Sequence, residues 1–342
     1  MTRSTRKNAD MAETPLLEAR KLRVEFTTRG RVVHAVSDVD MDLAPGEVLA
    51  IVGESGSGKS QMLLAMLGLT AQNARVTGSV RFEGKELVGA PESLLNQVRG
   101  NRIGFVFQDP MTSLNPYLSI GLQLTEPLRV HKNMGKAAAT AQAVEMLKAV
   151  HMSEPEQRMH QFPHQLSGGM RQRVAIAMAL MCSPKILIAD EPTTALDVTV
   201  QAQVLSLLRE IRERFGTAVI LVTHDLGVVA ELADRVNVMY AGRNVEKGTA
   251  EDIFYRCRHP YTEALQRSVP QLSQDRLVRL VAIEGNPPDP SALPPGCAYA
   301  PRCFYRLENC DQSVPPLEPV SGAHAKACIY EGKLKYQGET PA

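Results

Sequence analysis

A glycine-rich loop near residue 55 constrains the fold of this chain more than any other segment. The loop reads Gly53-Glu54-Ser55-Gly56-Ser57-Gly58-Lys59-Ser60 and matches the pattern G-x-x-x-x-G-K-[ST]. An apolar segment at 47–52 precedes it, and an apolar, helix-prone segment at 61–69 follows it. The glycines let successive backbone N–H groups face one point at a helix N-terminus, which favours a phosphate group. The pattern therefore predicts a strand, a phosphate-binding loop and a helix, with Lys59 at the terminal phosphates and the Ser60 hydroxyl on Mg²⁺.

A second apolar segment, at 185–190, ends in two adjacent carboxylates, Asp190 and Glu191. Downstream of a phosphate-binding loop, this pattern favours Asp190 as a residue that holds Mg²⁺ through its water shell. Glu191 is then the expected general base for an attacking water. The alternative interpretation is a buried strand followed by a solvated acidic turn.

Two other polar residues follow predicted strands. Gln108 ends the segment 103–108, and His224 follows the segment 218–223. A single Gln is usually a surface residue and a single His is usually structural. The carboxyl ends of strands in an α/β sheet are where such folds bind ligands, so both positions are candidate site residues.

A second candidate anion site lies far downstream of the first. Ser167, Gly168 and Gly169 offer a hydroxyl and N–H groups at the start of a predicted helix, and Met170 follows them. A helical insertion at about 112–165 separates this segment from Lys59, so a single shared pocket is not assumed.

The pattern of strands and helices divides the chain. Segments 17–25 and 35–43 suggest a β-hairpin, and the later alternation of strands and helices implies a mostly parallel sheet covered on both faces. After residue 255 many prolines leave little room for regular elements. We expect a disordered tail at 1–14, an α/β domain at 15–254 and a Cys- and Pro-rich extension at 255–342.

Four of the six cysteines cluster in this extension, at Cys297, Cys303, Cys310 and Cys328. In a reducing compartment such a cluster favours metal binding over disulfides. The chain has no C-x-x-C pair, so the spacing is not that of a zinc ribbon; zinc and an iron–sulfur cluster both suit four thiolates. His324 is an alternative fourth ligand.

Charge and hydropathy exclude some functions. The chain has 38 basic and 37 acidic residues, so no field of one sign points to nucleic acid. No apolar run approaches the ~18–20 residues that span a bilayer, and the N-terminus lacks the apolar region of a signal peptide. We expect a cytosolic chain that reaches a membrane only through partners.

The order of these motifs resembles the ATP-binding-cassette (ABC) ATPases, and residues 15–330 resemble the D-type ATPase subunit of oligopeptide and dipeptide ABC importers. Besides the loop 53–60, the match rests on the segments 107–116, 167–173, 190–203, 223–229 and 285–288.

The resemblance implies a role for each candidate residue. Gln108 would sense Mg²⁺ and the attacking water, and His224 would contact the γ-phosphate and orient Glu191. Asp197 would lie in a loop at the dimer interface; the alternative is that it only caps the following helix. Phe26 is the candidate for stacking on adenine, with a core Phe as the alternative.

The segment 167–170 would bind the ATP of an opposing subunit. Met170 stands where most of the superfamily has Gln, so a polar contact to the nucleotide is in doubt, but Met is usual in this branch. The tail cysteines would hold a [4Fe–4S] cluster, either as a structural staple or as a redox or iron sensor.

The implied complex contains a second ATPase subunit, expected to be a non-identical F-type chain, two membrane permease subunits and a separate substrate-binding protein. It would work at the cytoplasmic face of the inner membrane. An importer for nickel or another small solute is the alternative, and a soluble ABC ATPase acting on ribosomes or DNA is a further one.

Overall fold

The computed structural model describes residues 15–28, 30–109, 113–194, 197–268 and 283–335. The expected disordered tail at 1–14 lies outside the described residues. So do Ala195 and Leu196, and three residues of the loop after Gln108.

A small antiparallel sheet has the strand order β2-β1-β4-β5. The predicted hairpin is confirmed, although its strands are longer than predicted because they pair up to Thr28 and Arg31 next to the turn. The strands are β1 (Leu17–Thr28), β2 (Arg31–Leu43), β4 (Ala74–Phe82) and β5 (Lys85–Glu86).

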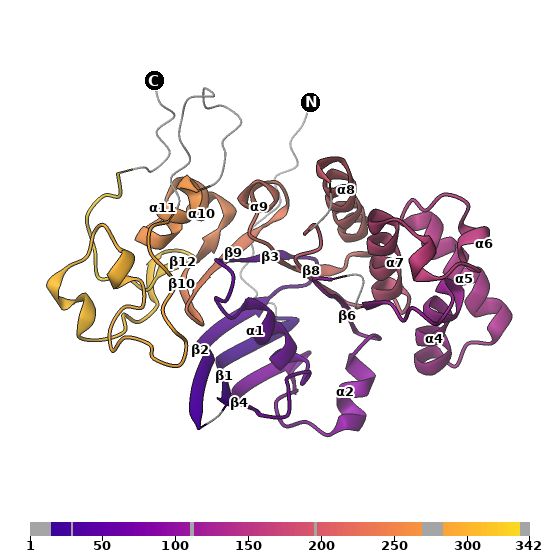
Figure 1. The fold of residues 1–342 in the computed structure, drawn as a ribbon, viewed down its shortest axis with the longest axis horizontal. Coiled ribbons are helices and arrows are strands. Elements are labelled where there is room, and N and C mark those ends of the chain that lie inside the picture. Colours follow the sequence, from indigo (N-terminus) through magenta and orange to yellow (C-terminus); the bar gives the residue numbers. More distant parts are fainter. Residues whose placement is uncertain (1–14, 29, 110–112, 195–196, 269–282, 336–342) are drawn as a thin grey trace.

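The large sheet has eight strands in the order β11-β12-β10-β9-β3-β8-β7-β6 (Figure 1). The five strands from β9 to β6 run parallel, and the other three continue the sheet in antiparallel pairing. The predicted parallel sheet is thus confirmed. Its strands are β3 (Val48–Val52), β6 (Ile103–Val106), β7 (Ile186–Asp190), β8 (Ala218–Val222), β9 (Arg235–Tyr240), β10 (Arg243–Thr249), β11 (Glu318–Ser321) and β12 (His324–Lys326).

Alternate residues of β7 face two different cores. Ile186 and Ile188 lie in the core that α1 (Lys59–Met66) enters, together with β1 and β2. Leu187 and Ala189 lie in the core that α7 (Gly168–Leu180) enters. Since successive side chains of a strand point to opposite faces, α1 and α7 cover opposite faces of the large sheet.

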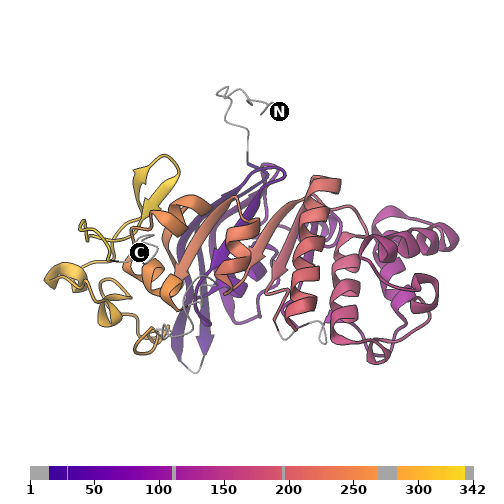
Figure 2. The same ribbon diagram turned by 90° about the horizontal axis from the view of Figure 1, so that it is seen from above.

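The helices between residues 120 and 180 gather at one end of the molecule (Figure 2). They are α4, α5, α6, the short 3₁₀ turn η1, and α7. The remaining bounds are α2 (Glu92–Val98), α4 (Ile120–Lys132), α5 (Lys136–Ala149), α6 (Pro155–Arg158), η1 (Pro163–Gln165), α8 (Val198–Phe215), α9 (Leu226–Leu232), α10 (Ala250–Tyr255) and α11 (Pro260–Arg267).

The segment after residue 255 contains a few short regular elements. Besides α11 it forms the 3₁₀ turns η2 (Ala300–Arg302) and η3 (Glu308–Asp311) and the strands β11 and β12. Strand β12 pairs with β10, so backbone hydrogen bonds attach this part of the segment to the large sheet. The rest of residues 283–335 is irregular, as the prolines predict.

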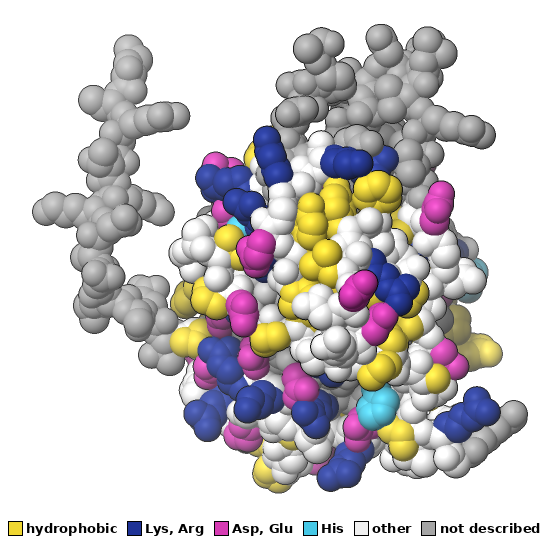
Figure 3. Space-filling view, turned by 90° about the vertical axis from the view of Figure 1, so that its left-hand side faces the viewer, with side chains coloured by type: hydrophobic (Ala, Val, Ile, Leu, Met, Phe, Trp, Pro, Cys, Tyr) yellow, Lys and Arg dark blue, Asp and Glu magenta, His cyan; other side chains and the backbone are white. Residues whose placement is uncertain are grey.

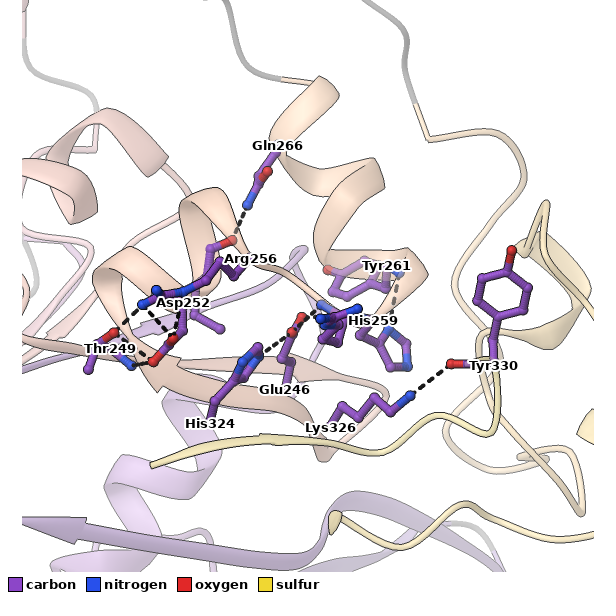
Figure 4. A network of polar contacts seen from close by, with 12 residues as sticks. Glu246, Thr249, Asp252, Arg256, His259, Tyr261, Gln266, His324, Lys326 and Tyr330 are labelled. Atoms are coloured by element: carbon purple, nitrogen blue, oxygen red, sulfur yellow. Dashed lines mark hydrogen bonds and ion pairs between the residues drawn. The ribbon is translucent and has the colours of Figure 1, made fainter. Parts of the chain in front are cut away.

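A buried polar network joins the C-terminal strand to the sheet (Figure 4). Glu246 of β10 is fully buried and accepts hydrogen bonds from the backbone N–H groups of Arg258 and His259. His324 of β12 lies 2.8 Å from the same carboxylate.

On the face that carries the C-terminal segment, acidic and basic side chains are interspersed with hydrophobic ones (Figure 3). No helix of the described residues is long and apolar enough to cross a bilayer.

Candidate active site

The glycine-rich loop connects β3 to α1 as predicted, with the helix beginning at Lys59. Gly58 has a φ of 94°, and a Cβ added there would lie 2.2 Å from the carbonyl oxygen of Ala35. Only glycine fits, because any side chain would clash and the backbone is left-handed. The loop is therefore held tightly against the antiparallel sheet.

Lys59 is buried under this loop. Its Nζ donates to the carbonyl oxygens of Gly53 at 2.8 Å and Glu54 at 2.9 Å, and lies 3.4 Å from Ser57 Oγ. Burial lowers the pKa of Lys59, while Glu191 and Asp190 act in the opposite direction. An anion in the loop would offer the ammonium a stronger partner than these carbonyls.

Asp190 ends β7 and is 4% exposed. Burial raises the pKa of Asp190, the nearby Glu191 raises it further, and a hydrogen bond with the Ser60 side chain lowers it. One carboxylate oxygen, Oδ1, is buried without a hydrogen-bond partner among the described residues. A buried carboxylate with a free oxygen beside a serine hydroxyl fits Mg²⁺, which prefers oxygen ligands.

The predicted catalytic residues Gln108 and His224 both lie close to the Glu191 carboxylate. Gln108 Nε2 donates to Glu191 Oε2 at 3.0 Å, and His224 Nδ1 lies 3.6 Å from the same oxygen. Thr194 Oγ1 also donates to it, at 2.9 Å. Sequence reasoning missed Thr194, although its place three residues after Glu191 in a turn could have indicated it.

The segment 167–170 begins α7 on the other face of the sheet. Ser167 caps the helix by accepting the N–H of Met170 at 3.3 Å, and Ser167 and Gly168 are exposed. Met170 packs against the core. The structure thus places this segment on a different helix and a different face of the sheet from Lys59.

Asp197 caps α8 through a 2.9 Å hydrogen bond from Val200 N–H to Asp197 Oδ1, so the capping interpretation is confirmed. Phe26 is half-buried on β1 and packs against the core around α1.

The four C-terminal cysteines carry free thiols. The pKa of Cys303 is raised to about 12, mainly by burial, and the neighbouring thiols of Cys328, Cys297 and Cys310 contribute in the same direction. Among the described residues, however, no three His, Cys, Asp or Glu side chains are arranged to hold a metal ion. His324, the alternative ligand, is directed at Glu246. The described residues therefore do not show a metal-binding arrangement at these cysteines.

Two further residues contact the phosphate-binding loop and were not predicted from the sequence. Tyr261 Oη accepts the N–H of Glu54 at 2.8 Å, and Arg302 forms an ion pair with the Glu54 carboxylate. Both come from segments more than 200 residues away, so no local pattern could have indicated them.

Comparison with known families agrees with this geometry. The ABC transporter family model matches residues 36–194, and the model of the oligopeptide/dipeptide transporter C-terminal region matches residues 245–310. The oligopeptide transport ATP-binding protein OppD of Salmonella typhimurium is 53% identical over 92% of this chain and 93% of its own length. This chain belongs to the ATP-binding subunits of ABC transporters.

Two other similar proteins support the same family assignment. The oligopeptide transport ATP-binding protein AppD of Bacillus subtilis is 49% identical over 92% of this chain and 97% of its own length. The dimeric structure of the bacterial ABC transporter cassette MJ0796 matches with a TM-score of 0.62 and 31% identity, and covers 68% of this chain and 98% of the cassette. The chain is therefore an ATPase that uses Mg²⁺ with its nucleotide.

Proposed function

We propose that this chain hydrolyses ATP to energise the import of oligopeptides or dipeptides through an ABC transporter. The observation that carries the catalytic part is the convergence of Gln108, Thr194 and His224 on the Glu191 carboxylate. The match of residues 245–310 to the oligopeptide/dipeptide transporter C-terminal region supports the substrate class.

The site divides the chemistry between its residues. Lys59 and the N–H groups of the loop 53–60 bind the phosphates. Ser60 and Asp190 would hold Mg²⁺, which would supply positive charge beside the phosphates. Glu191 accepts a proton from the attacking water as the γ-phosphoryl group leaves ADP for water, giving ADP and phosphate. Gln108, Thr194 and His224 keep the carboxylate oriented.

The segment 167–170 completes the site of a partner subunit in this proposal. Its Ser167 hydroxyl and the N–H groups of Gly168 and Gly169 would bind the γ-phosphate of the partner's ATP, beside Met170. Support comes from their place on the opposite face from α1 and from the exposure of Ser167 and Gly168. Asp197 would lie at the same dimer interface, and Phe26 would stack on adenine.

The proposed complex pairs this chain with a second, non-identical F-type ATPase subunit. The pair would dock on two membrane permease subunits at the cytoplasmic face of the inner membrane, and a separate binding protein would deliver the peptide.

Glu191→Gln tests the catalytic assignment. We expect the complex assembled with the variant to bind ATP while losing hydrolysis by roughly 10²–10⁴-fold, because the general base is gone. Equilibrium ATP binding and phosphate release would be measured on the same preparation. Hydrolysis at a near-normal rate would contradict the role of Glu191.

Uptake experiments test the substrate class. In cells lacking the native gene, the wild-type chain should restore uptake of labelled di- to pentapeptides, whereas the Glu191→Gln chain should not. Restoration of ⁶³Ni²⁺ uptake alone would point to the alternative of a nickel importer. Co-purification with ribosomes or DNA in place of membrane proteins would favour a soluble ABC ATPase.

The metal hypothesis for Cys297, Cys303, Cys310 and Cys328 remains a proposal supported by the sequence spacing and the proximity of the thiols. Thiolates bind metals by losing their protons, and an arrangement of four ligands would need these side chains to turn toward a common point. Protein purified without oxygen should show visible absorbance and bound iron if a [4Fe–4S] cluster is present. Stoichiometric zinc without that absorbance, or no metal at all, would contradict it.

A further inference from the structure

The phosphate-binding loop is held in part by a residue of the C-terminal segment. Arg302 lies in η2, next to Cys303, yet its guanidinium forms two hydrogen bonds with the Glu54 carboxylate. Nη1 donates to Oε2 at 2.7 Å and Nη2 to Oε1 at 3.0 Å. The Arg302 side chain is only 4% exposed, so this is a bidentate pair shielded from solvent on the arginine side.

Further hydrogen bonds hold the guanidinium at this position. It also donates to the Tyr240 hydroxyl at 3.1 Å and to the carbonyl oxygens of Glu284 at 2.9 Å and Ile283 at 3.2 Å. Both acceptor carbonyls belong to the C-terminal segment. The segment therefore fixes Arg302, and Arg302 fixes the second residue of the loop.

Glu54 is held from two sides. Its carboxylate pairs with Arg302, and its backbone N–H donates to Tyr261 Oη at 2.8 Å. Its carbonyl oxygen accepts from Lys59 Nζ at 2.9 Å. One residue thus connects the C-terminal segment to the lysine expected to bind the terminal phosphates.

The ion pair between Arg302 and Glu54 affects nucleotide binding because the Glu54 carboxylate is negatively charged. A carboxylate in a loop that binds a polyphosphate repels the ligand unless a cation compensates it. Among the described residues, Arg302 is the cation that forms an ion pair with this carboxylate. Without Arg302, the free carboxylate would also compete with the nucleotide for the Lys59 ammonium.

We propose that Arg302 is a positioning residue for ATP binding, acting through Glu54. It neutralises the Glu54 carboxylate and holds it aside, which leaves Lys59 and the loop N–H groups available to the phosphates. Arg302 does not touch the nucleotide in this scheme. The C-terminal segment is thereby a working part of the nucleotide site of its own chain.

Substitutions that remove one or both charges of the Arg302–Glu54 pair in the full-length chain test the proposal. Arg302→Gln should raise the Kd for Mg·ATP by about tenfold and raise KM to match, with kcat changed less than about twofold, because an uncompensated charge opposes ligand binding. Glu54→Gln alone should bind ATP at least as tightly as the wild type. The double variant Arg302→Gln/Glu54→Gln should recover most of the lost affinity.

The salt dependence of the affinity and a control variant separate the electrostatic effect of Arg302 from a general effect of losing an arginine. The affinity lost in Arg302→Gln should shrink as salt is raised, since screening weakens the repulsion. Arg306→Gln is the matched control, because Arg306 belongs to the same segment but is half-exposed and pairs with Asp311. Its Kd should equal that of the wild type.

Two outcomes would overturn the proposal. One is an Arg302→Gln chain with wild-type affinity; the other is a double variant that binds as weakly as Arg302→Gln, which would mean that Arg302 only supports the fold. If Arg302→Gln does not fold, the comparison moves to Arg302→Lys, which keeps the charge and loses the bidentate geometry. Arg302→Lys should bind ATP more weakly than the wild type, and adding Glu54→Gln should restore affinity; failure to restore it would equally overturn the proposal.

Discussion

At the scale of single residues, two adjacent carboxylates have different tasks because their surroundings differ. Asp190 is buried, and one of its oxygens has no hydrogen-bond partner among the described residues, which suits a cation. Glu191 has its Oε2 surrounded by an amide, a hydroxyl and an imidazole, which suits a base that must keep one orientation. The surroundings of the two carboxylates differ because the chain turns sharply at the end of β7, where Glu191 takes a φ of 46°.

Thr194→Val should reduce kcat about tenfold, because it removes one hydrogen bond to the charged Glu191 carboxylate. The change keeps the side-chain shape, so ATP affinity should stay close to that of the wild type. Steady-state phosphate release would measure it, with the exposed Thr199→Val as the control. An unchanged kcat would show that Gln108 and His224 suffice to orient Glu191.

His259 should make stability depend on pH. Its Nδ1 accepts the Tyr261 N–H at 3.1 Å, and burial, with Lys326 nearby, lowers its pKa to about 3. Between pH 6.5 and that value the unfolded chain binds a proton that the folded chain does not, so stability falls as pH falls. The free energy of unfolding in urea should lose about 1 kcal/mol from pH 7.5 to pH 5.5 through this group.

His259→Asn keeps a helix-capping acceptor and removes the titration, so this part of the pH dependence should disappear. Equal slopes for the two chains would contradict a neutral buried His259.

At the scale of elements, the contact between α7 and α8 depends on one glycine. A Cβ added to Gly169 would lie 2.7 Å from Val200 Cγ1. The two helices thus approach too closely for any side chain at this position, and Val200 cannot turn away easily because β-branched side chains are stiff.

Gly169→Ala should therefore destabilise the chain by about 1–3 kcal/mol, although alanine in an open helix position would stabilise it by about 1 kcal/mol. Adding Val200→Ala removes the clashing atoms and should restore most of the loss. Thermal unfolding of the single and double variants measures this coupling. A Gly169→Ala chain more stable than the wild type would show that the helices separate at little cost.

At the scale of the whole molecule, the C-terminal segment is continuous with the large sheet. Strand β12 pairs with β10, and His324 meets the buried Glu246. A segment built into the sheet in this way should unfold together with it in one transition.

His324→Leu should lower the free energy of unfolding by about 3 kcal/mol, because Glu246 would remain buried without its side-chain partner. Glu246→Gln in the same chain should recover part of the loss. Urea unfolding would measure both, with the exposed His160→Leu as the control. A separate early transition in the wild type would contradict the view of one cooperative unit.

Local patterns in the sequence determined the pieces of this protein. The spacing of Gly53, Gly56, Gly58 and Lys59 specifies a strand, loop and helix because only that backbone gathers N–H groups at one point. The apolar run before Asp190 predicts a buried strand in the same way, and β7 forms there.

Only the tertiary structure decided which of these pieces meet. Parallel pairing of β6, β7 and β8 brings Gln108, Glu191 and His224 together from the ends of separate strands. The folding of the C-terminal segment onto the sheet sets Arg302 against Glu54 across 248 positions of the chain. Ion pairs of this kind depend on the closure of long loops, which no local sequence pattern encodes.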